Sequence, residues 1–314
     1  MSGTERGRES GDGPARGHDH PGLRHRRGDE AGPLRDCDCD CDCDRGDGRA
    51  RRRGDGLRVM SFNLQVDGAE PPHTWSSRRD AAVELLRRAR PHLLGTQEGL
   101  PHQLRDLETG LGPHHARIGR GREEGGGGEH MAVLYDRRRL EALGHGHFWL
   151  SGTPEAVASN TWGGAFPRMV TWVRFRDLVT GARLHAVNTH FDHASAHARE
   201  RSAELLARRL NALEPHVPRI VTGDFNAPAG RSAEHATLLA GAGLVDAWDA
   251  AEERGPAYGT FHGHRAPVAD GERIDWILVS RGTRVRSASV DRFTAHGRSP
   301  SDHLPVRAVL DLPH

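Results

Sequence analysis

Hydrophobic and polar residues alternate along several short stretches of the chain, and this is the pattern of half-buried β-strands. Residues 169–176 and 182–189 form one such pair, and residues 177–181 between them predict a hairpin loop. The other predicted strands are residues 57–64, 92–98, 129–135, 219–221 and 272–279, and a last one that begins at Leu304.

Three stretches have features of helices. Residues 76–90 start with two serines that can cap a helix and stop before Pro91. Residues 194–213 place three leucines on one face, and residues 232–240 predict a shorter helix. Strands therefore alternate with helices in the middle of the chain and pair as hairpins elsewhere, which is an α/β (α+β) arrangement. No linker interrupts residues 57–314, so we predict one domain there.

Residues 1–56 differ from the rest. They are rich in Gly, Arg, Asp and His and have almost no large apolar residue, so we expect a disordered low-complexity tail. All four cysteines lie there, at every second position of residues 37–43. This spacing lacks the C-x-x-C pattern of zinc sites, and although soft thiolates could take up adventitious metal, a low-complexity repeat is the better interpretation.

Composition sets further limits on the function. The 44 basic residues, all arginine, nearly balance 43 acidic residues, so there is no global charge bias toward nucleic acid. No apolar run is long enough for an ordinary secretory signal or a membrane span, and we therefore expect a cytoplasmic protein without a membrane span. We infer no obligate protein partner.

The candidate chemistry centres on residues 221–228, Val-Thr-Gly-Asp-Phe-Asn-Ala-Pro. Asp224 and Asn226 lie two residues apart in an extended segment, so both side chains can point to one side. A carboxylate beside a carboxamide suits a divalent cation and a phosphate, because one supplies charge and the other neutral hydrogen bonds. A polar turn is the alternative for an isolated pair of this kind.

Other polar residues also stand at predicted strand ends. Asn63 closes the first strand and Glu98 the second, where a turn former and a surface carboxylate are the alternatives. His190, Asp192 and His193 follow the second strand of the hairpin and could form a metal cluster, although they lack a helical frame. The repeated position of such residues favours a functional site.

Asp275 lies at the centre of a buried strand, so it needs a partner. A histidine is the natural partner, and an arginine such as Arg273 is the alternative. Trp162 lies on a glycine-flanked loop ahead of Arg168, so the aromatic ring could stack on a base or sugar while the arginine binds phosphate. Ordinary packing of Trp162 is an equal alternative.

Six short segments in this order resemble the endonuclease/exonuclease/phosphatase superfamily, over residues 57–312. The segments are Ser61-Phe62-Asn63, Thr96-Gln97-Glu98, Asn188-Thr189-His190, Gly223-Asp224-Phe225-Asn226, Arg273-Ile274-Asp275 and Ser301-Asp302-His303. The resemblance, which is to a compact bacterial subgroup, implies a four-layer sandwich of two packed mixed β-sheets flanked by helices. It also implies a metal-dependent phosphoester hydrolase site at one end of the sandwich.

The resemblance implies a role for each residue of the site. The metal would be Mg²⁺, with Mn²⁺ as a substitute, and Asp275 would orient His303. The implied metal residues are Glu98, Asn63 and Asp302; the catalytic residues are His190, Asp224, Asn226, Asp275 and His303; and the substrate-binding residues are Arg168, Trp162 and Asn188.

The first functional hypothesis is Mg²⁺-dependent hydrolysis of a phosphodiester, as in a phosphodiesterase or nuclease. Hard oxygen ligands, a positioned water and donors for developing charge are what this reaction requires. No basic or aromatic patch for gripping a nucleic-acid backbone is found, so a small-molecule substrate stands beside a polynucleotide. The alternative is a phosphomonoesterase acting on a phosphorylated sugar, lipid headgroup or nucleotide. A non-catalytic binding module is less favoured, because no motif residue is missing.

Overall fold

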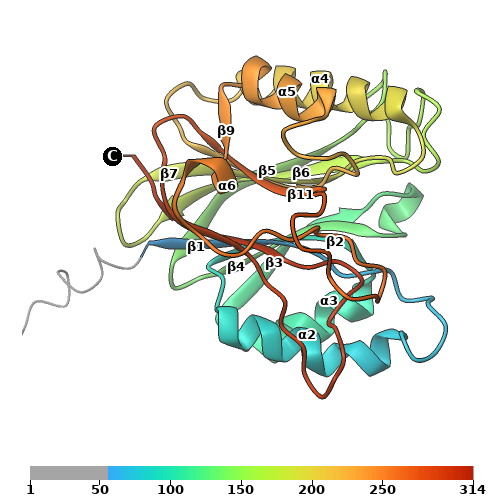
Figure 1. The fold of residues 1–314 in the computed structure, drawn as a ribbon. Helices are drawn as coiled ribbons and strands as arrows, with labels where there is room; N and C mark the ends of the chain where they lie inside the picture. The colour runs from blue at the N-terminus through green and yellow to red at the C-terminus, as the bar shows by residue number, and fades with distance from the viewer. Residues whose placement is uncertain (1–55, 314) are drawn as a thin grey trace, which may run out of the picture. The chain divides into compact units, whose positions relative to one another are not determined.

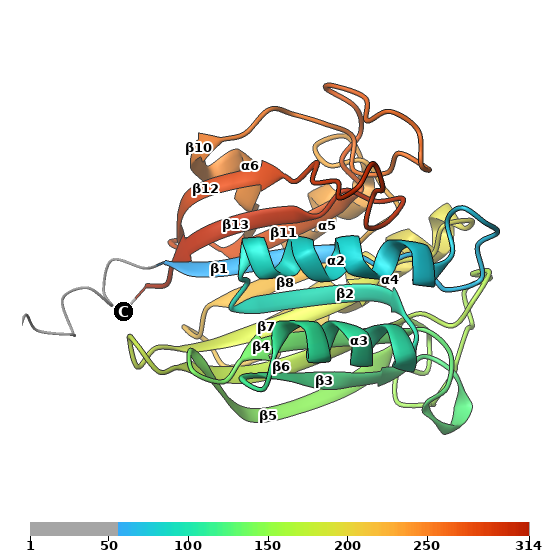
Figure 2. The same cartoon turned by 90° about the horizontal axis from the view of Figure 1, so that it is seen from below.

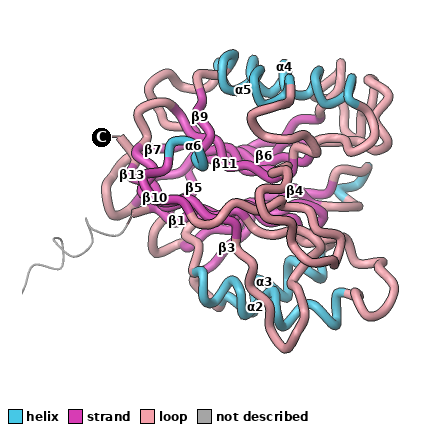
Figure 3. Tube along the Cα trace, viewed as in Figure 1, coloured by secondary structure: helices cyan, strands magenta, loops and turns pink. Residues whose placement is uncertain are grey.

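Two mixed β-sheets packed face to face form the frame of the protein, as the computed structural model shows for residues 56–313 (Figure 1). The tail predicted for residues 1–56 lies outside the described residues, apart from Gly56. Helices cover the outer faces of the sheets, and the strands lie in the middle of the described part (Figure 3). The predicted sandwich of two mixed sheets flanked by helices is therefore confirmed.

One sheet in the described part has seven strands and the other has six. The first contains β1 (Leu57–Asn63), β2 (Leu93–Gly99), β3 (His115–Gly121), β4 (His130–Asp136), β10 (Ala251–Arg254), β12 (Arg284–Val290) and β13 (Val306–Asp311), in the order β10-β12-β13-β1-β2-β4-β3. The second contains β5 (Leu140–Trp149), β6 (Met169–Asp177), β7 (Arg183–His190), β8 (Arg219–Asp224), β9 (Leu244–Asp246) and β11 (Asp275–Ser280), in the order β5-β6-β7-β8-β11-β9.

The helices divide between the two sheets. Helices α2 (Trp75–Ala89) and α3 (Pro101–Leu111) cover the seven-stranded sheet, while α4 (Ala196–Asn211) and α5 (Ala233–Gly241) cover the six-stranded sheet (Figures 1 and 2). Two shorter elements, η1 (Glu124–Gly126) and α6 (Ala247–Ala250), lie in connections. Within residues 56–313, no helix combines the length and the apolar character that a membrane crossing requires.

Alternation along each strand distributes its side chains between two cores. In β1, Val59 packs in the core between the sheets, while Met60 packs in the core beneath α2 and α3. In β8, Ile220 belongs to the core between the sheets and Val221 to the core beneath α4 and α5. The alternation of side chains in the sequence therefore corresponds to their alternation between two cores.

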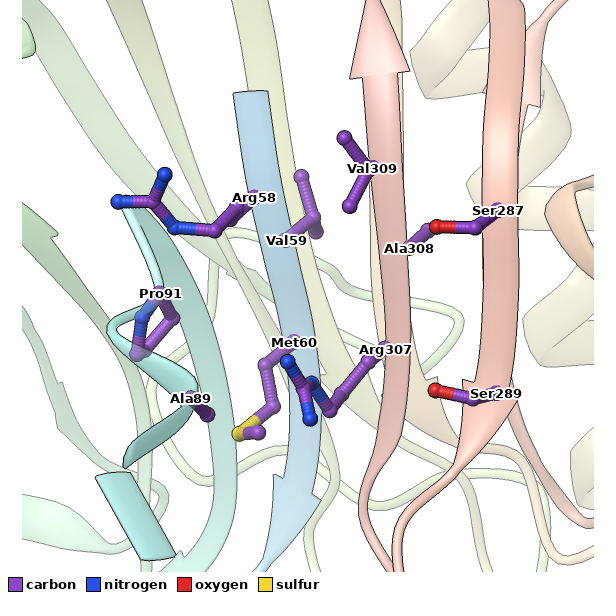
Figure 4. Close-up of a pocket in the computed structure, with 10 residues that line it drawn as sticks. All are labelled: Arg58, Val59, Met60, Ala89, Pro91, Ser287, Ser289, Arg307, Ala308 and Val309. Atoms are coloured by element: carbon purple, nitrogen blue, oxygen red, sulfur yellow. The ribbon is translucent and has the colours of Figure 1, made fainter. Parts of the chain in front are cut away.

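Strands β10, β12 and β13 of the seven-stranded sheet lie beyond α2 and α3 (Figure 2). Over β1, β13 and β12 the side chains of Arg58, Arg307, Ser287 and Ser289 line a small hollow (Figure 4). Antiparallel strands commonly have one face in the core and one in water, and this polar face needs no further covering helix.

Helix α3 and strands β3, β5 and β12 are not predicted by the sequence pattern. Strands β3 and β5 are interrupted by glycines and charged or histidine side chains, so their alternation is weak. Helix α3 is short and begins with Pro101, a residue that suits the first helical position. Both sheets therefore extend further than the sequence indicates.

Gly95 allows β2 to approach the facing sheet. A Cβ at this position would lie 2.0 Å from Thr222 Oγ1 and 2.6 Å from Asn188 Oδ1. We therefore predict that Gly95→Ala lowers the free energy of unfolding by about 1–3 kcal/mol, as overpacking does in well-packed cores. Chemical denaturation measures this change. Gly144→Ala in β5 is the control, because its added Cβ meets no atom within 4 Å. Equal stability of the two variants would contradict the close approach of the sheets.

Candidate active site

The register of the six-stranded sheet places three polar residues side by side at one end. Asp224, the last residue of β8, is the partner of His190 in β7 and of Asp275 in β11. All three side chains are buried. Neighbouring strands therefore bring two carboxylates and an imidazole to one corner of the sandwich.

The seven-stranded sheet contributes Asn63 and Glu98 to the same corner. Asn63 Nδ2 donates to Glu98 Oε1 and to Asp224 Oδ2, each at 2.9 Å, so this amide links the two sheets. Glu98 lies in a register irregularity of β2 and has a left-handed backbone, with φ of 62°. Bulges and strained residues of this kind redirect side chains at functional sites.

His303 contacts both buried carboxylates. Its Nδ1 lies 2.9 Å from Asp275 Oδ2, and its Nε2 lies 3.7 Å from Asp224 Oδ2. Burial alone would lower the pKa of His303, but the charges of Asp275 and Asp224 raise this pKa to about 10. His303 is therefore an imidazolium at neutral pH. The alternative partner for Asp275 is wrong, since Arg273 Nη2 donates to Asp246 instead.

Asp224 and His190 are held by Asn226. The Asn226 backbone N–H donates to Asp224 Oδ1 at 2.9 Å, and Asn226 Nδ2 lies 3.1 Å from His190 Nε2. Burial and the charge of Asp275 raise the pKa of Asp224. Burial and the charge of Arg168 keep the pKa of His190 well below its usual range. His190 is therefore neutral, and its Nε2 accepts from the Asn226 amide.

Two buried arginines complete the surroundings of His190. Arg168, predicted from the sequence, and Arg122, which was not predicted, both lie close enough for their charges to lower the pKa of His190. Arg122 Nη1 donates to Glu129 Oε2 at 2.7 Å. Arg122 directly follows β3, an unpredicted strand, and no motif in the sequence marks it.

Asn188, which the resemblance assigns to substrate binding, has a different position in the structure. Asn188 is fully buried between the sheets, where its side chain contacts Thr96, Ala132, Gln97 and Thr222. All its hydrogen-bonding capacity is used there, so this geometry assigns it to sheet packing and leaves no atom for a substrate.

Trp162 is half-buried and packs against the core beneath α4, which is the packing alternative. Asp192 accepts backbone N–H groups of Ala165, Ala194 and Ser195, and it belongs to no candidate metal group among the described residues. This carboxylate joins the loop before Arg168 to the start of α4. The proposed cluster of His190, Asp192 and His193 does not form.

Two groups of side chains in residues 56–313 could hold a metal ion. The second group, Asp224, Asp275 and His303, is a poorer candidate, because both ring nitrogens of His303 already face the carboxylates of Asp275 and Asp224. The first group combines the carboxylates of Glu98 and Asp224 with neutral His190, with ligand atoms within 4.8 Å of one another. Its oxygen donors fit a hard divalent cation.

Asp302 lies outside both groups. Burial and the nearby charge of Glu98 raise the pKa of Asp302, against the influence of His303. Its backbone carbonyl accepts the N–H groups of His262 and Gly263. Asp302 therefore lies near Glu98, but the two carboxylates do not belong to a common candidate metal group among the described residues.

Two residues that the sequence analysis did not select also border the site. The Phe261 ring is 53% exposed, and its centroid lies 5.0 Å from that of His303. Arg78, buried near the start of α2, donates to the carbonyls of Leu64, Gln65, His73 and Pro300. Arg78 therefore joins the segment after Asn63 to the segment before His303.

Comparison with known proteins agrees with this arrangement. A sequence model of the Endonuclease/Exonuclease/phosphatase family matches residues 60–303. No curated protein matches the chain. Among solved structures, a mannosyl-6-phosphatase from Bacteroides thetaiotaomicron shares 31% identity and a TM-score of 0.75, covering 81% of this chain and 99% of its own.

Two further solved structures show higher and lower sequence identity to this chain. An endonuclease/exonuclease/phosphatase from Bacteroides vulgatus shares 33% identity over 82% of this chain and 99% of its own, with a TM-score of 0.77. The human Nocturnin catalytic domain shares the fold at 18% identity, with a TM-score of 0.65 over 82% of this chain and 95% of its own. The chain therefore belongs to the endonuclease/exonuclease/phosphatase family and is a hydrolase of phosphoester bonds.

Proposed function

We propose that the protein is a Mg²⁺-dependent phosphoric ester hydrolase that uses the Asp275–His303 pair and Asp224 on the scissile phosphate. The observation that carries this proposal is the buried His303 ring, which lies between the carboxylates of Asp275 and Asp224, while Asn63 links Asp224 to Glu98. A fixed cation in a site with little water stabilises negative charge that develops on phosphoryl oxygens. Hydrolysis of a phosphoester needs a group of this kind beside the bound phosphate.

The metal would be held by Glu98 and Asp224. Asn63 bonds to both carboxylates and so keeps their oxygens at a fixed separation. When bound, the cation supplies positive charge for the phosphate and its leaving group, and hard oxygen ligands favour Mg²⁺ with Mn²⁺ as a substitute. Asp302, whose pKa is raised by burial and by the nearby charge of Glu98, would hold water near this position.

The remaining polar groups of the site would position the water and the phosphate. Asp224, which accepts the backbone N–H of Asn226 and lies 3.7 Å from His303 Nε2, would keep these groups in place around the phosphate. His303 keeps its proton and would donate a hydrogen bond from Nε2 to a phosphoryl oxygen. Asn226 would align the water or phosphate through its amide, and neutral His190 would offer its Nδ1–H, which has no partner among the described residues.

The substrate we favour is the monoester of a small phosphorylated sugar. The similarity to a mannosyl-6-phosphatase over nearly all of that chain supports this choice over the phosphodiester hypothesis. The two hypotheses are tested by measuring hydrolysis of a hexose 6-phosphate, p-nitrophenyl phosphate and bis-p-nitrophenyl phosphate with Mg²⁺, Mn²⁺ or EDTA. Activity on the diester alone would return the assignment to a phosphodiesterase.

Glu98→Gln should weaken metal binding far more than it weakens the fold. The change keeps the shape of the side chain but removes the charge that holds a divalent ion. We expect the Mg²⁺ concentration for half-maximal activity to rise by more than about 10-fold, the lower end of the loss seen for partners outside a coordination shell. Calorimetric titration with Mn²⁺ gives a readout independent of activity. Glu84→Gln on the exposed side of α2 is the control. An unaltered titration would exclude Glu98 as a ligand.

Asp275→Asn and His303→Ala should not have independent effects. If Asp275 holds His303 in place, each change removes the same working unit, so the double variant loses little more activity than either single variant. One positioned acid or base group contributes about 10²–10⁴-fold in rate. Turnover of all three variants is measured beside their melting temperatures. Losses that multiply would contradict the pairing.

The raised pKa of His303 also predicts a pH dependence of stability. Folding favours the protonated imidazole, so this contribution is complete below pH 6.5 and is lost as pH rises toward about 10. Asp275→Asn removes a charge that raises this pKa. The difference in unfolding free energy between the native chain and the variant should therefore shrink from pH 6.5 to 10, by at most about 1.4 kcal/mol per pH unit. Denaturation in EDTA measures it, and a constant difference would refute the ion pair.

A further inference from the structure

Arg122 and Arg168 form a pair of buried cations with free donor atoms. Arg122 is 4% exposed and Arg168 is 6% exposed. The Nε of Arg122 and the Nε and Nη1 of Arg168 have no hydrogen-bond partner among residues 56–313. Buried donors without an acceptor are costly, so proteins retain them where a ligand provides the missing acceptors.

The neighbouring carboxylates do not satisfy these donors. Glu129 binds Arg122 through Nη1, leaving Nε without an acceptor. Asp192 lies 3.7 Å from Arg168 Nε, beyond hydrogen-bond distance, and its oxygens accept backbone N–H groups. Burial and the charge of Arg122 lower the pKa of Arg168. The two guanidinium groups thus repel each other and leave donors for an anion.

Phe166 shields this pair from water. The Arg122 guanidinium lies 4.6 Å from the centroid of the Phe166 ring, and the Arg168 guanidinium lies 6.0 Å from it. The ring is 46% exposed, so it borders both the arginines and solvent. Partial exclusion of water strengthens the interaction of a guanidinium with a phosphate.

We propose that Arg122 and Arg168 together select phosphomonoesters, by binding the terminal oxygens of a dianionic phosphate group. This inference rests on the proposed function and names Arg122 as a specificity-determining residue. A monoester offers three non-bridging oxygens, while a diester replaces one of them with an ester group. A diester would therefore set a weaker acceptor against buried donors and leave part of them unpaired.

The test compares p-nitrophenyl phosphate with bis-p-nitrophenyl phosphate. The native chain should show the higher kcat/KM for the monoester. Arg122→Gln removes one charged hydrogen bond, a type that contributes about 1.5–3 kcal/mol, so the monoester kcat/KM should fall about 10- to 150-fold. The diester kcat/KM should fall by a smaller factor, because the diester offers one fewer non-bridging oxygen to these donors. Arg122→Lys keeps the charge without the planar fork and should recover part of the loss.

A binding measurement separates recognition from folding. Inorganic phosphate should inhibit the native chain competitively, and its inhibition constant should rise in Arg122→Gln by a factor similar to the monoester loss. Arg139→Gln is the matched control, because Arg139 is also buried but pairs with Asp177, where neither residue belongs to the candidate site.

The possible results distinguish failure of the Arg122 proposal from failure of the proposed hydrolysis. Equal losses on monoester and diester, or native preference for the diester, would overturn the selection by Arg122 while leaving the proposed hydrolysis intact. Absence of turnover on either ester with Mg²⁺ or Mn²⁺ would instead contradict the proposed function. If Arg122→Gln does not fold, the native substrate preference and the Arg122→Lys variant decide the question.

Discussion

Burial of two carboxylates at one corner of the sandwich is the constraint on which the site depends. Asp224 and Asp275 are adjacent across β8 and β11, and both are nearly inaccessible to water. Removing a charge from water costs several kcal/mol unless a partner compensates for it. His303 compensates for part of this charge, and the remaining negative charge is what a divalent cation would meet. The negative charge of this corner and the proposed binding of a metal ion therefore have the same origin.

The two-sheet architecture is what makes such a corner possible. The six-stranded sheet supplies the charges on adjacent strands, and the facing sheet supplies Asn63 and Glu98. Because the Asn63 amide donates to a carboxylate from each sheet, a shift of one sheet against the other would break the site before it disturbed the core. Close packing at Gly95 fixes the spacing of the sheets and so the spacing of the candidate ligands.

The sequence predicts the strands that carry the site, because their alternation and their polar ends coincide. Asp224 is found from its spacing to Asn226 and Asp275 from its place in a buried strand, while the choice of His303 as the partner of Asp275 comes from the family resemblance. Arg122 is not found, because β3 has little alternation and a buried arginine looks like any other arginine in a chain without lysine. Asn188 stands near a strand end like the residues of the candidate site, and its position between the sheets emerges only from the packing.

The hydrogen bonds of Arg78 have a consequence for how the protein becomes active. The same guanidinium binds the carbonyls of Leu64 and Pro300, and β1 pairs with β13. A ribosome-bound chain that has not reached residue 300 lacks one of these carbonyls, the strand beside β1 and His303. Contacts of such long sequence separation form late and slowly. The arrangement of the candidate site therefore cannot form before residues 300–311 have been synthesised.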